Sequence, residues 1–229
     1  MKHITCIIPA YNEGPRIRGV LSVVAGHPLV NEVVVVNDCS KDNTAEIVAE
    51  FPSVRLVNHT INQGKSLAIV TGLKEARNDT VMFIDADLIG ITPQNITDLI
   101  APVADGAADI SISLRKNAPP AWHWIGLDYI SGERVMPKEF ILSHASEIAK
   151  LPRFGLETWM NKLIVSKKYR IRVVRWDNVE SPFKYNKAGK KFSAFTAIKD
   201  EWPMMQDIFK VANPIRLLAL IYQMLSLRV

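Results

Sequence analysis

Short runs of apolar and often β-branched residues alternate with amphipathic segments through the first half of the chain. Such runs are typical of buried strands, and the segments between them repeat apolar positions at helical spacing. We expect strands over Ile4–Pro9, Val33–Asn37, Val54–Asn58, Val81–Ile84 and Ile110–Leu114. We expect helices near Gly14–Val24, Asn43–Glu50, Lys65–Ala76 and Pro93–Ala104. The alternation predicts right-handed βαβ units and a mainly parallel α/β sheet that helices cover on both faces.

The pattern is less regular in the second half. Pro137–Lys150 and Gly155–Lys168 predict helices, and Tyr169–Glu180 alternates like a strand. Ser181–Ser193 is polar and basic and contains a glycine, so we expect a mobile loop there. The apolar stretch Pro214–Leu227 predicts a C-terminal helix. Because no linker or repeat divides the chain before it, we expect one domain that ends near residue 213.

Composition limits the class of protein. The chain has 229 residues, of which 48% are apolar and 22% are charged, and this excludes a disordered chain and a disulfide-rich secreted scaffold. Cys6 and Cys39 lie in or beside apolar runs without metal-ligand spacing, which indicates buried thiols in a reducing compartment. The N-terminus carries only a short apolar run, so we expect no secretory signal and a cytoplasmic protein.

The net charge of +5 is unevenly distributed. Residues 1–149 hold 12 basic and 17 acidic residues, whereas residues 150–191 hold 12 basic and 3 acidic ones. The excess therefore lies between Lys150 and Lys191. A solvated basic surface and a site for phosphates explain this stretch equally well.

Polar residues gather directly after the predicted strands, where parallel sheets bind their ligands. The segments read PAYNE at 9–13, DCSKDNT at 38–44, NQGKS at 62–66 and DAD at 85–87. Two carboxylates separated by one small residue disfavour joint ionisation unless a cation lies between them. A divalent metal that is also bound to substrate phosphates supplies such a cation. Asp85 and Asp87 are therefore our candidate metal ligands.

In this order and at about this spacing, the four segments together resemble the family 2 glycosyltransferases of the GT-A fold. The resemblance is strong over residues 4–115 and loose over the rest. It implies one catalytic domain over 1–213 with a mainly parallel, Rossmann-like sheet. Residues 1–115 would bind the donor sugar nucleotide and the metal, residues 116–213 would bind the acceptor, and 214–229 would form an added amphipathic or apolar helix.

The resemblance also implies roles for single residues toward a UDP- or GDP-linked sugar and Mg²⁺ or Mn²⁺. Asp38 would hydrogen-bond the base, and Lys65, at a helix start, would favour the phosphates. Asp85 would face the ribose or the metal, and Asp87 would bind the metal. The remaining donor-side positions are Pro9, Tyr11 and Glu13 at the nucleoside and Ala86 between the two aspartates.

The acceptor stays open between two chemistries. Family 2 enzymes invert the anomeric centre, and a hydroxyl acceptor then needs a general base, for which Glu157 fits the family's position. A polyprenyl phosphate is already anionic and needs cations instead. The chain is similar to polyprenol-phosphate sugar synthases such as dolichol-phosphate mannosyltransferase, which implies that Arg115 and Arg134 bind the acceptor phosphate. Ile89 departs from those synthases, which commonly carry a polar metal-binding residue there.

We expect functional contacts from two further segments, the predicted loop and the C-terminal helix. The predicted loop would close over the donor diphosphate with four lysines, Lys184, Lys187, Lys190 and Lys191. The C-terminal helix is shorter than the roughly 20 apolar residues that span a bilayer, so we expect peripheral contact with the inner membrane face, a partner chain or the core. A non-enzymatic nucleic-acid-binding module would explain the basic stretch but not the strand-end carboxylates, so we expect no nucleic-acid partner.

Overall fold

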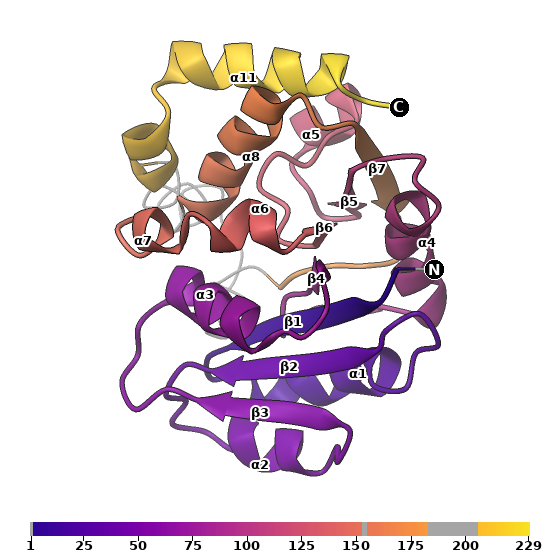
Figure 1. Cartoon of the computed structure of the whole chain (residues 1–229), viewed down its shortest axis with the longest axis vertical. Helices are drawn as coiled ribbons and strands as arrows, with labels where there is room; N and C mark the ends of the chain where they lie inside the picture. Colours follow the sequence, from indigo (N-terminus) through magenta and orange to yellow (C-terminus); the bar gives the residue numbers. More distant parts are fainter. Residues whose placement is uncertain (1, 153–154, 183–205) are drawn as a thin grey trace.

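One seven-stranded sheet runs through the molecule in the order β3-β2-β1-β4-β6-β5-β7 (Figure 1). The computed structural model describes residues 2–152, 155–182 and 206–229. The strands are β1 (Ile4–Ala10), β2 (Glu32–Asn37), β3 (Val54–Asn58), β4 (Thr80–Phe83), β5 (Ile110–Arg115), β6 (Arg134–Pro137) and β7 (Ile171–Trp176). The helices are α1 (Gly14–Val24), α2 (Thr44–Ala49), α3 (Lys65–Glu75), α4 (Pro93–Ala104), α5 (Pro120–Ile125), α6 (Glu139–Leu142), α7 (Ala145–Ile148), α8 (Leu156–Lys167) and α11 (Pro214–Ser226).

The sheet is mainly parallel, as the alternation of strands and helices predicted. β3, β2, β1 and β4 are parallel neighbours, and β5 pairs with β7 in the same sense. β6 is antiparallel to both β4 and β5, and the sequence pattern did not reveal it. β6 lies between the parallel strands β3, β2, β1 and β4 and the parallel pair β5 and β7. It therefore joins strands from both halves of the chain into one sheet.

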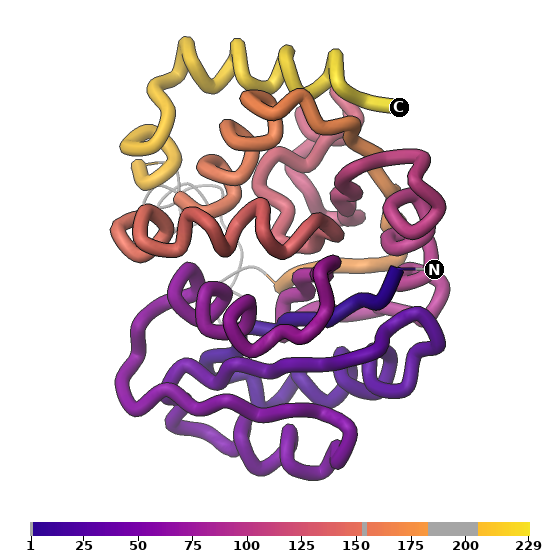
Figure 2. Tube along the Cα trace, viewed as in Figure 1, coloured from indigo at the N-terminus to yellow at the C-terminus, as the bar shows by residue number. Residues whose placement is uncertain are grey.

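Apolar side chains of the sheet contribute to two large cores among the described residues, one on each face. In β1, Ile4, Cys6 and Ile8 pack with α1, α2 and α4, whereas Ile7 points to the other face and packs with α3. The second core continues through α6, α7, α8 and α11. Figure 2 shows that the chain up to α3 fills one end of the molecule and that α8 and α11 fill the opposite end. The mainly parallel α/β sheet with helices on both faces is confirmed.

Most predicted elements of the first half agree with the structure to within two residues. The start of α4 is set by a capping box in which Thr92 and Asn95 exchange side-chain and backbone hydrogen bonds. The single helix predicted over Pro137–Lys150 is wrong, because the segment begins at the last residue of β6 and then forms two short helices, α6 and α7. Cys6 is buried, but Cys39 is only half-buried, which corrects the expectation for that thiol.

α11 lies across α8 at the end of the described chain (Figure 1). Leu220 and Met224 are buried against the second core. On the outer face, Ile215, Leu218 and Tyr222 are at least 70% exposed. In the described ranges, no helix is both long and apolar enough to pass through a bilayer.

Candidate active site

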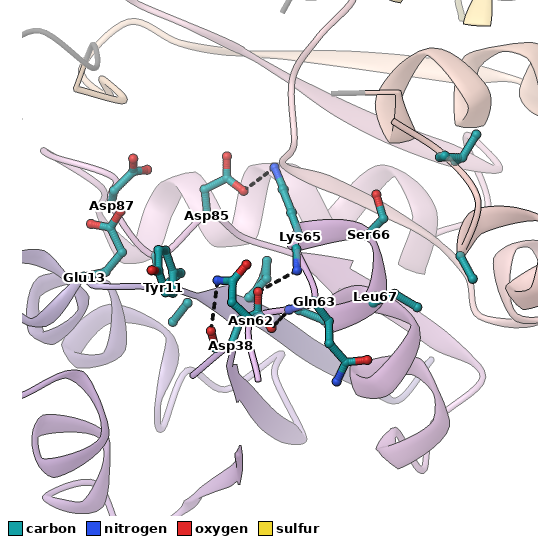
Figure 3. Close-up of a pocket in the computed structure, with 17 residues that line it drawn as sticks. Tyr11, Glu13, Asp38, Asn62, Gln63, Lys65, Ser66, Leu67, Asp85 and Asp87 are labelled. Carbon is teal, nitrogen blue, oxygen red and sulfur yellow. Dashed lines mark hydrogen bonds and ion pairs between the residues drawn. The ribbon is translucent and has the colours of Figure 1, made fainter. Parts of the chain in front are cut away.

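A cavity of about 640 Å³ opens beyond the carboxyl ends of β1, β2 and β4 (Figure 3). The loop before α3 supplies part of its wall, and Ala149 and Leu151 extend the wall from the second half of the chain. Eight residues that the sequence suggested for donor binding line the cavity: Pro9, Tyr11, Glu13, Asp38, Lys65, Asp85, Ala86 and Asp87. The strand-end clustering is therefore confirmed as a feature of the fold.

The loop after β1 is fixed by the loop after β2. Three backbone N–H groups near the start of α1, which lack partners within the helix, donate to three side-chain oxygens of the second loop. The bonds join Asn12 N to Ser40 Oγ (3.0 Å), Glu13 N to Thr44 Oγ1 (2.9 Å) and Gly14 N to Asp42 Oδ2 (3.0 Å). Desolvation would raise the pKa of Asp42, but hydrogen bonds from Thr44 and Gly14 outweigh it and lower that pKa. The second motif thus positions the backbone that carries Tyr11.

Asp38 is buried at the cavity wall and organises the loop that begins α3. Its Oδ1 accepts from His59 Nδ1 (2.8 Å) and Gln63 N (2.8 Å), and its Oδ2 accepts from Gly64 N (2.7 Å). Gly64 has a φ of 87°, a conformation that favours glycine. A carboxylate accepts about four hydrogen bonds, so these three donors leave capacity for one from a ligand. Asp38 therefore shapes the cavity in addition to its expected contact with the base.

Lys65 connects the two halves of the site. Its Nζ lies 2.8 Å from Asp85 Oδ1 and 3.1 Å from Glu157 Oε1, and its side chain is half-buried. Burial alone would lower the pKa of the ammonium, but Asp85, Glu157 and Glu133 outweigh it and raise that pKa. Glu157 lies in the first turn of α8, as expected, and reaches the cavity wall through Lys65.

Asp87 is held by the segment after β7. Ser181 Oγ donates to Asp87 Oδ1 over 3.2 Å, and the Asn178 amide donates to the Gly90 carbonyl over 2.7 Å. Ile89 exchanges backbone hydrogen bonds with Glu180 and leaves its side chain exposed. Position 89, where the resemblance predicts a polar residue, thus contributes its backbone to fixing the Asp-Ala-Asp loop.

Arg115 lies behind this wall and bonds to protein carboxylates. Its guanidinium is 3.2 Å from Asp128 Oδ2 and 3.5 Å from Glu133 Oε2. Burial raises the pKa of Glu133, Arg115 opposes this shift, and Ser113 and Ser131 donate to its Oε2. In this arrangement Arg115 is a partner of internal carboxylates, and it is not among the residues that line the cavity.

Arg134 does not reach the cavity. It is fully buried in β6, and its three nitrogens donate to Ser131 O (2.8 Å), Asn161 Oδ1 (2.6 Å) and Tyr129 O (3.3 Å). Desolvation lowers its pKa. In this structure the side chain joins the 129–131 segment to α8, and its expected contact with an acceptor phosphate stays a prediction.

Asp85 and Asp87 suit a cation that is also bound by substrate phosphates and water better than one that is bound by protein side chains alone. Within the described ranges, no group of three or more His, Cys, Asp or Glu side chains is placed to hold a metal. Mg²⁺ usually takes one or two carboxylates and completes its shell with substrate phosphates and water. The two carboxylates at the cavity wall match that pattern. The loop lysines Lys184, Lys187, Lys190 and Lys191 lie outside the described residues.

Comparison with known proteins identifies the family of the chain. The family model described as glycosyl transferase family 2 matches residues 5–165, which include every motif of the cavity and the start of α8. The chain belongs to glycosyl transferase family 2. The cavity lies within the part of the chain that matches the family model.

Its relatives include transferases named for lipid phosphates. A dolichyl-phosphate beta-glucosyltransferase of Trichomonas vaginalis is 37% identical over 98 residues, which cover 37% of this chain and 29% of the relative. The dolichol-phosphate mannosyltransferase of Pyrococcus furiosus is 37% identical over 117 residues, 49% of this chain and 33% of the relative. A UDP-N-acetylglucosamine--dolichyl-phosphate N-acetylglucosaminyltransferase of Methanococcus voltae is 29% identical over 213 residues. This match covers 75% of this chain and 83% of the relative. This family 2 glycosyltransferase thus spans about a third or less of the first two relatives.

A solved structure shares the fold. Glucosyl-3-phosphoglycerate synthase of Mycobacterium tuberculosis, in complex with Mn²⁺, UDP-glucose and phosphoglyceric acid, superposes with a TM-score of 0.69 at 20% identity. The match covers 92% of this chain and 79% of that one. It supports the GT-A-type fold of the family 2 chain.

Sequence reasoning missed several groups of the site. His59 directly follows β3, at the same sheet edge as Asp38, so its position was a usable signal. Glu133 and Asp128 are buried carboxylates that balance Arg115, and they precede a strand that the pattern did not reveal. Ala149 and Leu151 are apolar positions without any motif.

Proposed function

We propose that this family 2 glycosyltransferase moves a sugar from a UDP- or GDP-linked donor to a polyprenyl phosphate, with inversion and with Mg²⁺ or Mn²⁺. The observation that carries the proposal is the cavity in which Tyr11, Asp38 and Lys65 line the same wall as Asp85 and Asp87. The three relatives named for dolichyl or dolichol phosphate support the acceptor class.

Each part of the cavity has a role in this reaction. The ring of Tyr11 offers a flat face to the base, and Asp38 accepts a hydrogen bond from it. The start of α3, with Lys65, faces the diphosphate, because free N–H groups at a helix N-terminus favour anions. A divalent cation bound to Asp85, Asp87 and the diphosphate would stabilise the negative charge of the leaving group.

Transfer to a hydroxyl is the second candidate, and the position of Glu157 favours it. Glu157 lies within hydrogen-bond distance of Lys65, which also contacts Asp85, so a carboxylate stands beside the donor cavity. Arg115 and Arg134, by contrast, are bound to internal partners. For a phosphate acceptor, the proposal therefore needs cations other than these two arginines.

Replacement of Glu157 separates the two acceptors. Glu157→Gln keeps an oxygen for Lys65 but removes the base, so it should abolish transfer to a hydroxyl and spare transfer to polyprenyl phosphate. Glu139→Gln, at an exposed helix start, is the matched control. If Glu157→Gln spares both reactions, Glu157 is not a catalytic base.

The donor is tested by ligand-induced stabilisation. A ligand that binds the folded state alone stabilises it by RT ln(1 + L/Kd), where L is the free ligand concentration, so the unfolding temperature rises with ligand concentration. We expect UDP or GDP and one of their sugars to raise it, with a larger rise in Mn²⁺. If no nucleotide shifts the transition with or without metal, the proposed donor class is wrong.

We also propose peripheral contact with a membrane surface at its cytoplasmic face. The outer face of α11 carries Ile215, Leu218 and Tyr222, and Trp124 on α5 is 90% exposed. An interfacial helix binds through such an apolar stripe. Changing the three α11 residues to serine should prevent co-sedimentation with anionic liposomes, whereas Ile61→Ser, at another exposed apolar position, should not. Equal binding by both variants would contradict the contact.

A further inference from the structure

Lys65 stands where a cation is expected. Its ammonium is 2.8 Å from Asp85 Oδ1, one of the two carboxylates that we assign to the metal. The backbone passes close above this pair, since a Cβ on Gly132 would lie 2.8 Å from Lys65 Nζ and 2.9 Å from Asp85 Oδ1. A side chain at position 132 would force the ion pair to move. The pair therefore fills a space that the second half of the chain leaves for it.

The same ammonium holds Glu157, the candidate base of the acceptor half. Nζ lies 3.1 Å from Glu157 Oε1, so one lysine joins a metal-ligand candidate on the donor side to a carboxylate at the start of α8 (Figure 3 shows the Asp85 contact). An ammonium has three donors, which allows both contacts at once. A ligand that moves the Lys65 ammonium away from Asp85 therefore also changes its contact with Glu157.

The charges around Lys65 explain why it sits there before a donor binds. Asp85, Glu157 and Glu133 all act on it, and Arg115 balances Glu133 and Asp128 from behind. Without Lys65, Asp85 and Glu157 would both lose the ammonium that they contact, and neighbouring carboxylates without it disfavour joint ionisation. The lysine therefore supplies the charge that a divalent cation would supply at Asp85.

We infer that Lys65 is an exchangeable counter-ion, which bridges Asp85 and Glu157 in the donor-free site and leaves Asp85 for the donor diphosphate when a divalent cation binds. The inference rests on the proposed function for the identity of the incoming ligands. It makes Lys65 a positioning residue that couples metal occupancy to the release of Glu157. No atom is transferred in this exchange; one cation replaces another at the same carboxylate.

The exchange predicts opposite effects of one substitution on two ligands. In Lys65→Met, Mn²⁺ alone no longer competes with an ammonium for Asp85, so it should bind more tightly by on the order of tenfold. UDP with saturating Mn²⁺ should bind more weakly by on the order of tenfold, because the diphosphate loses a positive partner. A lysine that only stabilises the fold would not move the two affinities in opposite directions.

The test counts free Mn²⁺ by electron paramagnetic resonance and measures UDP binding by calorimetry. Lys74→Met, an exposed lysine on the same helix, is the matched control and should change neither affinity. Lys65→Arg keeps the charge and should hold Mn²⁺ affinity near the wild-type value. If Mn²⁺ affinity is unchanged or falls in Lys65→Met, the exchange is wrong.

A measurement on the wild-type protein covers the case in which Lys65→Met does not fold. The ammonium resonance of Lys65, assigned with Lys65→Arg, should shift when Mg²⁺ is added and shift again with UDP. An unmoved resonance at saturating Mg²⁺ would overturn the exchange. Failure of the wild type to bind UDP would count instead against the proposed function, because the exchange at Asp85 is measured with metal alone.

Discussion

Asp42 is the residue through which the structure makes its clearest energetic prediction. Its carboxylate accepts from the Gly14 N–H and from the N–H and hydroxyl of Thr44, and it thereby ties the loop after β1 to the start of α2. Asp42→Ala leaves the Gly14 N–H and the N–H and hydroxyl of Thr44 without this acceptor. The loop that carries Tyr11 loses one of its fixed points.

The expected loss of stability is about 2 kcal/mol, because a lost side-chain hydrogen bond costs about 1 kcal/mol and this carboxylate accepts from two chain segments. Asp42 is half-buried, so water replaces part of the lost bonding. Its pKa is lowered in the folded protein, so its contribution is present above about pH 4 and is lost as pH falls through the folded value. The difference between wild type and variant should therefore shrink in acid.

Urea unfolding followed by circular dichroism measures this difference. With a slope of about 3 kcal/mol per molar, Asp42→Ala should lower the midpoint by about 0.7 M at pH 7. Asp79→Ala, at an exposed aspartate, should leave the midpoint unchanged at pH 7 and in acid. Equal midpoints for the two variants at pH 7, or a gap that does not shrink as pH falls below about 4, would refute the role given to Asp42.

Two further substitutions test the packing. Arg134→Met should lower stability by about 3 kcal/mol, because it leaves buried carbonyl and amide oxygens without donors; an unchanged unfolding midpoint would contradict this internal role. Gly72→Ala should cost about 2 kcal/mol, because its Cβ would overlap Ile7 Cγ2 between α3 and β1. Gly19→Ala, with no atom within 4 Å of the added Cβ, should stabilise by about 0.5 kcal/mol, and calorimetric unfolding distinguishes the two signs.

The donor half could be predicted because its signals are local. Each apolar run of the first half forms a strand over nearly the predicted residues, and parallel strands place their carboxyl ends together. Asp38, Lys65 and Asp85 were therefore predicted to be near one another without knowledge of any contact. Their partners, such as His59 for Asp38 and Glu157 for Lys65, come from tertiary structure.

The acceptor half was harder because its elements depend on packing. The helix predicted through residues 137–150 breaks at His144, whose ring packs against Trp159 at 5.4 Å, and Glu147 accepts from the Trp159 indole. Arg134 shows why the role of a single side chain was harder to predict from the sequence. An arginine beside acidic residues suits a phosphate and a buried internal network equally well, and the sequence pattern does not show that Arg134 is buried.

The most direct test of the proposed function is a transfer assay with metal and chelator arms. Donor sugars linked to UDP or GDP are incubated with polyprenyl phosphate, and the product lipid is measured by mass spectrometry. We predict a glycosylated lipid phosphate that forms in Mn²⁺ or Mg²⁺ and is lost with EDTA and in Asp87→Ala. No product with any donor, or product that persists in Asp87→Ala, would contradict the account.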